Sequence, residues 1–167
     1  DRPPYRRIPY AEALAKYGSD KPDLRNPIVN VDASEVFRTS GFNAFRSVVE
    51  KGGVVRAIPV PAIAGKPRSF FDKLVELAQS LGSKGLAYLI WEDGIVKGPI
   101  AKFLKPGELS AIQSACGVKE GDVVFFVCAA ARLANRIAGE IRTHLGRELD
   151  LLEKDVFRLC WIVDYPM

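Results

Sequence analysis

The sequence feature that most constrains the fold is an uninterrupted apolar run over residues 123–128, followed at once by a segment with helical spacing. A short run of this kind is typical of a strand that is covered on both faces. In the second segment, apolar residues recur every three or four positions, as they do in a helix with one buried face. These residues are Ala130, Leu133, Ala134, Ile137, Ala138, Ile141 and Leu145. We therefore predict a central strand over 122–128 and a long amphipathic helix after it.

Two glycine-containing turn signals predict β-hairpins. The first hairpin would cover residues 42–60 and turn at Gly52-Gly53. The second would cover residues 86–97 and turn at Asp93-Gly94. Glycine adopts positive φ values without steric cost, and Asp-Gly is a frequent pair in the tight turns of hairpins.

The remaining periodic segments complete the predicted element order. Further helices are predicted over residues 10–17, 33–38, 67–81 and 106–115, with a last strand over 157–163. Asp32 is placed to cap the second of these helices, and Pro106 lies in the first turn of the fourth. The order of hairpin, helix, hairpin, short helix, strand and helix predicts an α+β fold of two layers. We expect a mainly antiparallel sheet with helices packed on one face.

Composition bounds the class of protein. Of the 167 residues, 48% are hydrophobic and 26% are charged, so a core can form without disulfides. The three cysteines, Cys116, Cys128 and Cys160, are widely spaced, which favours buried, reduced thiols. There is no signal-peptide pattern and no apolar run of the roughly 20 residues that a membrane span requires. We expect a soluble cytoplasmic protein, and the missing initial Met leads us to expect a piece of a longer chain.

Few residues could support catalysis or metal binding. His144 is the single histidine, and its place late in a predicted helix favours a structural role. The sequence contains no GxSxG nucleophile motif, no GxxxxGK[ST] phosphate loop and no GxGxxG motif after a strand. A metal site would need more histidine or clustered cysteine. We therefore predict no catalytic residue, no metal site and no cofactor within this chain.

Basic residues provide the evidence for a binding function. The formal net charge of +4 is compatible with RNA binding but does not require it. The candidate contacts to RNA phosphates are Lys84, Lys97 and Lys102, in or near the second predicted hairpin, and Arg132 and Arg136, one turn apart on the long helix. The alternative is a solvated helix face, in which Arg136 pairs with Glu140 four residues later.

Several longer motifs together resemble one family. The string YGSDKPDLR over residues 17–25, preceded by RIPYAEA over 7–13, is similar to the segment after the second class II motif of bacterial-type aspartyl-tRNA synthetases. The other segments that resemble this family are KGLAY (84–88), GPIAKFL (98–104), GDVVFF (121–126) and LCWIVDYPM (159–167). The first two of these resemble paired signatures of the family's inserted GAD domain. The resemblance spans essentially the whole chain in the family's order.

The resemblance implies a GAD-type β-β-α-β-β-α core over residues 28–150, with pieces of the class II catalytic domain over 1–27 and 151–167. It also implies a parent enzyme that attaches L-aspartate to tRNA(Asp) with ATP and Mg²⁺, as a cytoplasmic homodimer without a DNA partner. The class II motifs that hold ATP in the family have no counterpart here. No catalytic role therefore carries over to any residue, and this chain alone is expected to be inactive.

Several roles for such a segment stay open at this point. It could shape the approach of the tRNA acceptor arm, with salt-sensitive binding centred on residues 84–102 or 130–147. It could instead be a structural or protein-interaction module that stabilises its parent without touching RNA. A related module in the B subunit of a tRNA-dependent amidotransferase is a further alternative, although the flanks of this chain resemble the synthetase.

Overall fold

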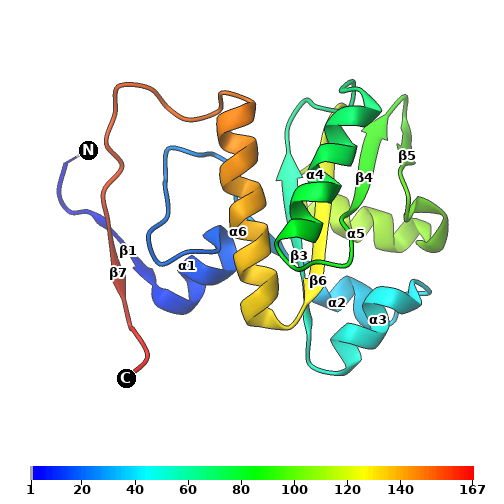
Figure 1. The fold of residues 1–167 in the computed structure, drawn as a ribbon, viewed down its shortest axis with the longest axis horizontal. Coiled ribbons are helices and arrows are strands. Elements are labelled where there is room, and N and C mark those ends of the chain that lie inside the picture. The colour runs from blue at the N-terminus through cyan, green and yellow to red at the C-terminus, as the bar shows by residue number, and fades with distance from the viewer. Residues whose placement is uncertain (1) are drawn as a thin grey trace.

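A computed structural model describes residues 2–167 and contains a five-stranded sheet beside a smaller two-stranded one (Figure 1). The strands are β1 (Arg6–Pro9), β2 (Val31–Asp32), β3 (Val54–Val60), β4 (Ala87–Glu92), β5 (Ile95–Lys97), β6 (Val123–Ala129) and β7 (Cys160–Val163). The helices are α1 (Tyr10–Tyr17), α2 (Ser34–Arg38), α3 (Asn43–Glu50), α4 (Arg68–Ser80), α5 (Pro106–Cys116) and α6 (Ala131–Glu148), with a short 3₁₀ helix, η1 (Ala101–Phe103). The larger sheet has the antiparallel order β2-β3-β6-β4-β5. The predicted α+β class with an antiparallel sheet is confirmed.

Strand β6 is the central strand that its apolar run predicts. It pairs with β3 on one side and with β4 on the other. Successive side chains of a strand point to opposite faces, so an apolar run supplies two cores at once. Phe125 lies in the core on one face of the sheet and Phe126 in the core on the other, and both are buried.

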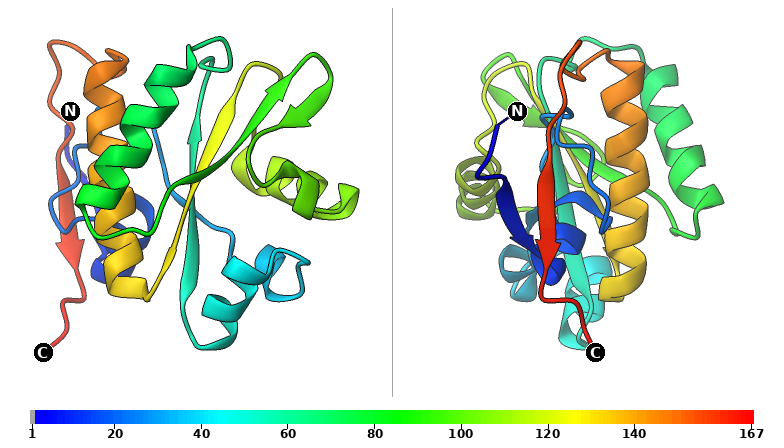
Figure 2. Two further views of the ribbon diagram at one scale, coloured as in Figure 1. Left: turned by 45° about the vertical axis from the view of Figure 1, so that its right-hand side comes forward. Right: turned by 90° about the vertical axis from the view of Figure 1, so that its left-hand side faces the viewer.

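Helices cover both faces of the larger sheet (Figure 2). The long helices α4 and α6 pack on the face of Phe125, through residues such as Leu74 and Ile137. The shorter helices α2, α3 and α5 supply Phe37, Val49 and Ile112 to the opposite core. The sequence analysis expected helices on one face of the sheet, and the two long helices do pack together on one face. It did not predict that the shorter helices cover the opposite face. That cover is needed because a sheet that is apolar on both faces must be shielded on both.

The predicted hairpin over residues 42–60 is wrong in its first half, because residues 43–50 form helix α3. The apolar residues Phe42, Phe45 and Val49 are three and four positions apart, and together they pack into the core on the α3 side. That spacing is helical, and the Gly-Gly pair follows the end of a helix. The second predicted hairpin is confirmed: β4 and β5 are antiparallel, and the turn at Asp93-Gly94 has positive φ at both residues.

Near the two ends of the described chain, β1 and β7 form a parallel pair, with Arg6 opposite Cys160 (Figure 2). Helix α1 follows β1 and shares a small core with it, made by Ile8, Ala13 and Tyr17. The sequence predicted α1 and an apolar strand near β7, but it did not predict β1. This unit packs against α6 through α1. The boundaries at residues 27/28 and 150/151 stay predictions.

Candidate nucleic-acid interface

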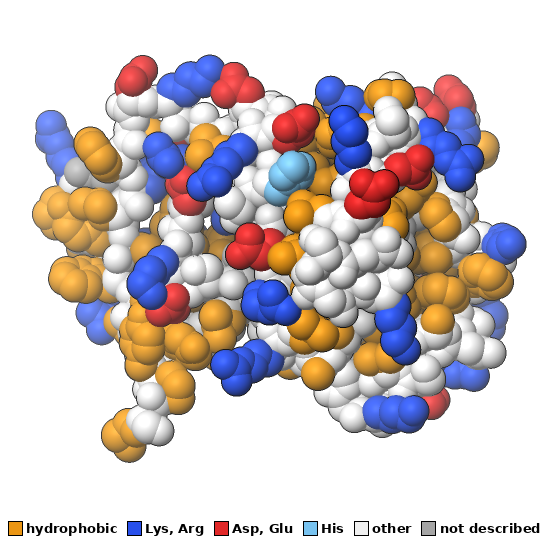
Figure 3. Space-filling model, in the orientation of Figure 1, with side chains coloured by type: hydrophobic (Ala, Val, Ile, Leu, Met, Phe, Trp, Pro, Cys, Tyr) orange, Lys and Arg blue, Asp and Glu red, His pale blue; other side chains and the backbone are white. Residues whose placement is uncertain are grey.

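A groove of about 860 Å³ runs between α1 and the first turns of α6. Its lining residues are Tyr10, Leu14, Gly18, Ala130, Arg132, Leu133, Asn135 and Arg136. Figure 3 shows Lys and Arg side chains over the lower end of α6, where this helix begins. The groove combines an apolar floor with two of the five basic residues that the sequence singled out.

The groove owes its shape to a close approach between α1 and α6. Helix α1 ends at Gly18, which has a φ of 73° and donates its N–H to the Leu14 carbonyl. A Cβ atom built on Gly18 would lie 2.4 Å from the Cα of Gly139 on α6. Because both positions lack side chains, the two backbones come into direct contact there.

The loop after α1 is held on α6 by a buried arginine. Arg142 is 1% exposed, and its guanidinium donates to the backbone carbonyls of Asp23, Asn26 and Ile28. The same guanidinium lies 4.9 Å from the centre of the Tyr17 ring. These contacts hold residues 23–28 against α6.

The two groove arginines are exposed and keep most of their hydrogen-bonding capacity. Arg136 donates from Nη2 to the Leu81 carbonyl at 2.9 Å. Within residues 2–167 neither Arg132 nor Arg136 forms an ion pair, so the proposed pair with Glu140 is absent there. A guanidinium has five N–H donors, and Arg136 uses one of them in this contact.

Helix α6 adds positive potential at the same end. It begins after Ala130 with no side-chain cap and no acidic residue in its first turn. The first N–H groups of a helix have no carbonyl partner within it, and they carry the positive end of the helix dipole. Both the backbone N–H groups at the start of α6 and the side chains of Arg132 and Arg136 therefore make the groove electropositive.

Asn135 is a polar groove residue that the sequence analysis missed. Its Oδ1 accepts a hydrogen bond of 2.7 Å from Nε of Arg56, a residue on β3 that is 7% exposed. Arg56 is held in turn by Asp32, with Nη1 and Oδ2 3.2 Å apart. Burial tends to raise the pKa of Asp32, but hydrogen bonds from Ser34 and the charge of Arg56 outweigh it, so the pKa is lowered. The one sequence signal for this network is Arg56 itself, which is a charged residue inside the otherwise apolar segment 54–60.

The three candidate lysines lie elsewhere. Lys84 is exposed in the loop after α4, three positions beyond the Leu81 carbonyl that Arg136 contacts. Lys97 on β5 forms ion pairs of 3.0 Å with Asp93 and 3.2 Å with Glu92, and these partners raise its pKa. Lys102 on η1 lies over the ring of Phe103. The structure thus groups Arg132, Arg136 and the Lys84 loop, and it separates them from Lys97 and Lys102.

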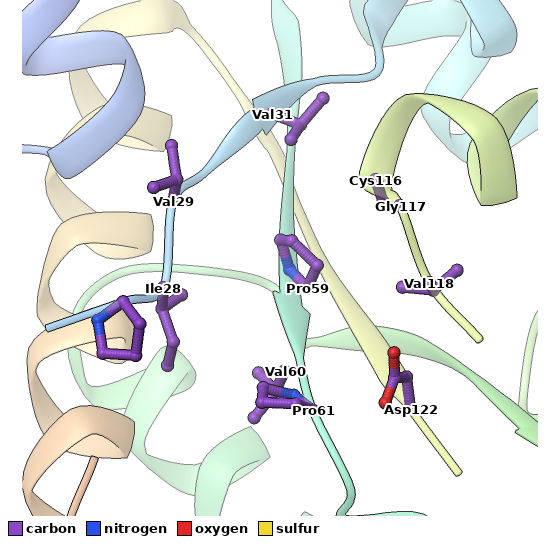
Figure 4. A pocket seen from close by; sticks show the side chains of 11 residues that line it. Ile28, Val29, Val31, Pro59, Val60, Pro61, Cys116, Gly117, Val118 and Asp122 are labelled. Atoms are coloured by element: carbon purple, nitrogen blue, oxygen red, sulfur yellow. The ribbon is translucent and has the colours of Figure 1, made fainter. Parts of the chain in front are cut away.

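Two other hollows lack the chemistry of a phosphate site. A cleft of about 300 Å³ lies between the segment at Val29, the end of β3 and the C-terminal end of α5. Figure 4 shows the side chains that line it. Its lining is mostly Val, Ile and Pro, and the carboxylate of Asp122 already accepts from the N–H groups of Ala62 and Lys119. A second hollow, between α4 and α6, contains His144 and Arg147 beside Glu140 and Glu148. The carboxylates of Glu140 and Glu148 would repel a bound anion.

Among residues 2–167, no three His, Cys, Asp or Glu side chains are grouped to hold a metal ion. None of the described helices is both long and apolar enough to cross a membrane.

Comparison with known proteins gives a consistent set of relatives. The GAD domain family matches residues 45–138. Aspartate–tRNA(Asp/Asn) ligase of Paramagnetospirillum magneticum is 56% identical over 164 residues, which is 98% of this chain and 19% of that protein. The ligases of the same name from Rickettsia felis and Anaplasma marginale are 52% and 56% identical, over 98% and 96% of this chain and 27% of each relative. The chain spans about a fifth to a quarter of the length of these curated relatives.

Proposed function

We propose, from the premise that this chain belongs to the GAD domain family, that it is the inserted module of an aspartate–tRNA ligase with short flanks of the catalytic domain. The parent would attach L-aspartate to tRNA(Asp) with ATP and Mg²⁺, as a cytoplasmic homodimer. The relatives cover both flanks of the family match, since they align over 96–98% of the chain. That coverage favours the ligase over an amidotransferase module.

The observation that carries this proposal is the exposed apolar face of the segment around β7. Phe157 is 80% exposed and Trp161 is 59% exposed, whereas Ile162 on the opposite face of β7 packs against the Ile8 core. A parallel two-stranded sheet is rare alone, because parallel sheets are normally covered on both faces. Such an apolar face fits a segment that packs against further parts of the parent.

Mg²⁺ does not fit the described residues of this chain. Magnesium needs a set of oxygen ligands, and among residues 2–167 no carboxylate cluster supplies it. The class II motifs that hold ATP in the family have no counterpart in the sequence. We therefore assign nucleotide and aspartate binding to the rest of the parent, and no reaction step to this chain.

The test is the amino-acid specificity of the full-length protein. We expect aspartate-dependent exchange of pyrophosphate into ATP and aspartylation of tRNA(Asp) by the full-length protein, and neither reaction by residues 1–167 alone. Charging with a different amino acid, or adenylate formation by the isolated chain, would overturn the proposal.

For the role of the module, we propose that it guides the tRNA acceptor arm, because the α1–α6 groove is electropositive and open. The second candidate is a structural or protein-interaction module without RNA contact, which the apolar face near Trp161 favours. Charge reversal at Arg132 and Arg136 in the full-length protein separates the two. A raised KM for tRNA supports the first role, and unchanged tRNA kinetics support the second.

A further inference from the structure

We infer that the α1–α6 groove binds the sugar–phosphate backbone of one RNA strand, with successive phosphates at Arg132 and Arg136 and without reading base sequence. The inference rests on the proposed function, because it specifies how the module would meet tRNA. It places the contact on a surface shared by the flank helix α1 and the GAD helix α6. It also excludes the β4–β5 hairpin, which the sequence alone had left as an equal candidate.

The first support is charge. Residues four apart on a helix are neighbours, with Cβ atoms about 5–6 Å apart, so the two guanidinium groups can reach adjacent phosphates of one strand. Neither group is neutralised by an acid within the described chain, and the uncapped start of α6 points its own N–H groups to the same end. Phosphate oxygens are the acceptors that such donors favour.

The second support is the floor of the groove. Leu14 and Leu133 provide apolar surface against which a ribose can lie, and the ring of Tyr10 is fixed by a contact of 4.9 Å with the ring of Tyr165. Asn135 presents its amide nitrogen as a donor, because Arg56 occupies its oxygen. These groups contact sugar or phosphate and carry no base code, so we expect binding that depends on salt more than on sequence.

The third support is the poor fit of the other basic residues. Lys97 is paired with two carboxylates, and the ammonium group of Lys102 lies 5.1 Å from the centre of the Phe103 ring. Bringing a phosphate to Lys97 would also bring it to Asp93 and Glu92. A double variant at these lysines therefore removes the same formal charge as a double variant at the arginines, and it serves as a matched control.

The test uses residues 1–167 with fluorescein-labelled transcripts of tRNA(Asp) and of a non-cognate tRNA, by fluorescence anisotropy at several salt concentrations. We expect Arg132→Ala with Arg136→Ala to weaken binding of both transcripts by at least about 10-fold, and to reduce the salt slope by roughly 1.4–1.8 for two lost phosphate contacts. Lys97→Ala with Lys102→Ala should change affinity by less than about 2-fold.

Arg132→Ala alone guards against a folding artefact, because Arg136 also contacts the Leu81 carbonyl and Arg132 does not. This single variant should lose about half of the salt-slope change. Equal effects of the two double variants, unchanged affinity in the arginine variants, or no binding by the unaltered chain at low salt would overturn the inference. Loss of aspartate specificity in the full-length protein would overturn the proposed function while leaving this result standing, so the two failures are distinguishable.

Discussion

Gly18 and Gly139 meet backbone to backbone where α1 crosses α6. A Cβ atom on Gly139 would lie 2.8 Å from the Cα of Gly18 and 3.0 Å from its carbonyl oxygen. The neighbour at this point is main chain, which cannot move aside as a flexible side chain can. Helices α1 and α6 are therefore fixed to each other at a point where neither tolerates a methyl group.

Replacing Gly139 by Ala should destabilise the chain. Alanine favours a helix over glycine by about 1 kcal/mol, but overpacking against backbone costs typically 1–3 kcal/mol, so we expect a net loss in the free energy of unfolding. Gly107→Ala on α5 is the control, since nothing lies within 4 Å of its Cβ position. Urea unfolding measures both, and a Gly139→Ala chain as stable as the unaltered one would contradict the packing described here.

Replacing Arg142 by Met should release the loop after α1. The substitution leaves the carbonyls of Asp23, Asn26 and Ile28 without their donor, and each buried acceptor left unsatisfied costs about 1–3 kcal/mol. Urea unfolding gives the stability, and trypsin cleavage after Arg25 reports on the loop.

The control for that experiment is Arg147→Met, on the same helix but exposed, which should change stability by no more than about 0.5 kcal/mol. If Arg142→Met leaves cleavage after Arg25 as slow as in the unaltered chain, Arg142 does not hold the loop.

Cys116 and Cys128 should resist alkylation at neutral pH. Burial raises the pKa of each thiol from 9.0 to about 11, so at pH 8 the reactive thiolate is on the order of 100-fold scarcer than for an unperturbed cysteine. The protonated form is favoured in the folded chain, so the associated stability is present below pH 9 and is lost as the pH rises toward 11. Iodoacetamide labelling followed by peptide mass spectrometry tests this, and rapid labelling of either residue at pH 8 would refute it.

Asn135→Asp should weaken RNA binding without unfolding the chain. The variant keeps the shape and the acceptor for Arg56, but it replaces the amide donor in the groove by a carboxylate oxygen. We expect tRNA affinity to fall several-fold and the free energy of unfolding to stay equal or rise. Asn43→Asp, exposed on α3, makes the same charge change away from the groove and should leave both quantities unchanged.

The sequence predicted those parts of the fold that depend on local pattern. The apolar run at β6 and the spacing of residues 130–145 determined the central strand and its helix, and the Asp93-Gly94 turn determined the β4–β5 hairpin. The prediction is wrong at residues 42–49 because a Gly-Gly pair suits the end of a helix as well as a hairpin turn, whereas the 3–4 spacing of Phe42, Phe45 and Val49 indicates a helix. Periodicity was the stronger signal there.

The candidate site depends on contacts between residues far apart in the chain, which a local sequence pattern does not predict. Parallel pairing of β1 with β7 and the contact of Gly18 with Gly139 join segments that are far apart in the chain. The sequence already offers a reason to question Lys97 as a phosphate contact, because Glu92 and Asp93 lie within five residues of it across the predicted turn. The side chain of Asn135 on α6 is oriented by a hydrogen bond from Arg56, which lies on the distant strand β3.

The most direct test of the account is hydrogen–deuterium exchange of the full-length protein with and without tRNA(Asp). The first amides of α6 lack acceptors within their helix, so they exchange quickly until a phosphate binds them. We predict slower exchange with tRNA at residues 131–133, whose amides precede the first hydrogen bond from Ala134 to the Ala130 carbonyl, and in the loop at 81–86. We predict little change over residues 92–103. Slowing confined to residues 92–103, or none on α6, would contradict a nucleic-acid interface between α1 and α6.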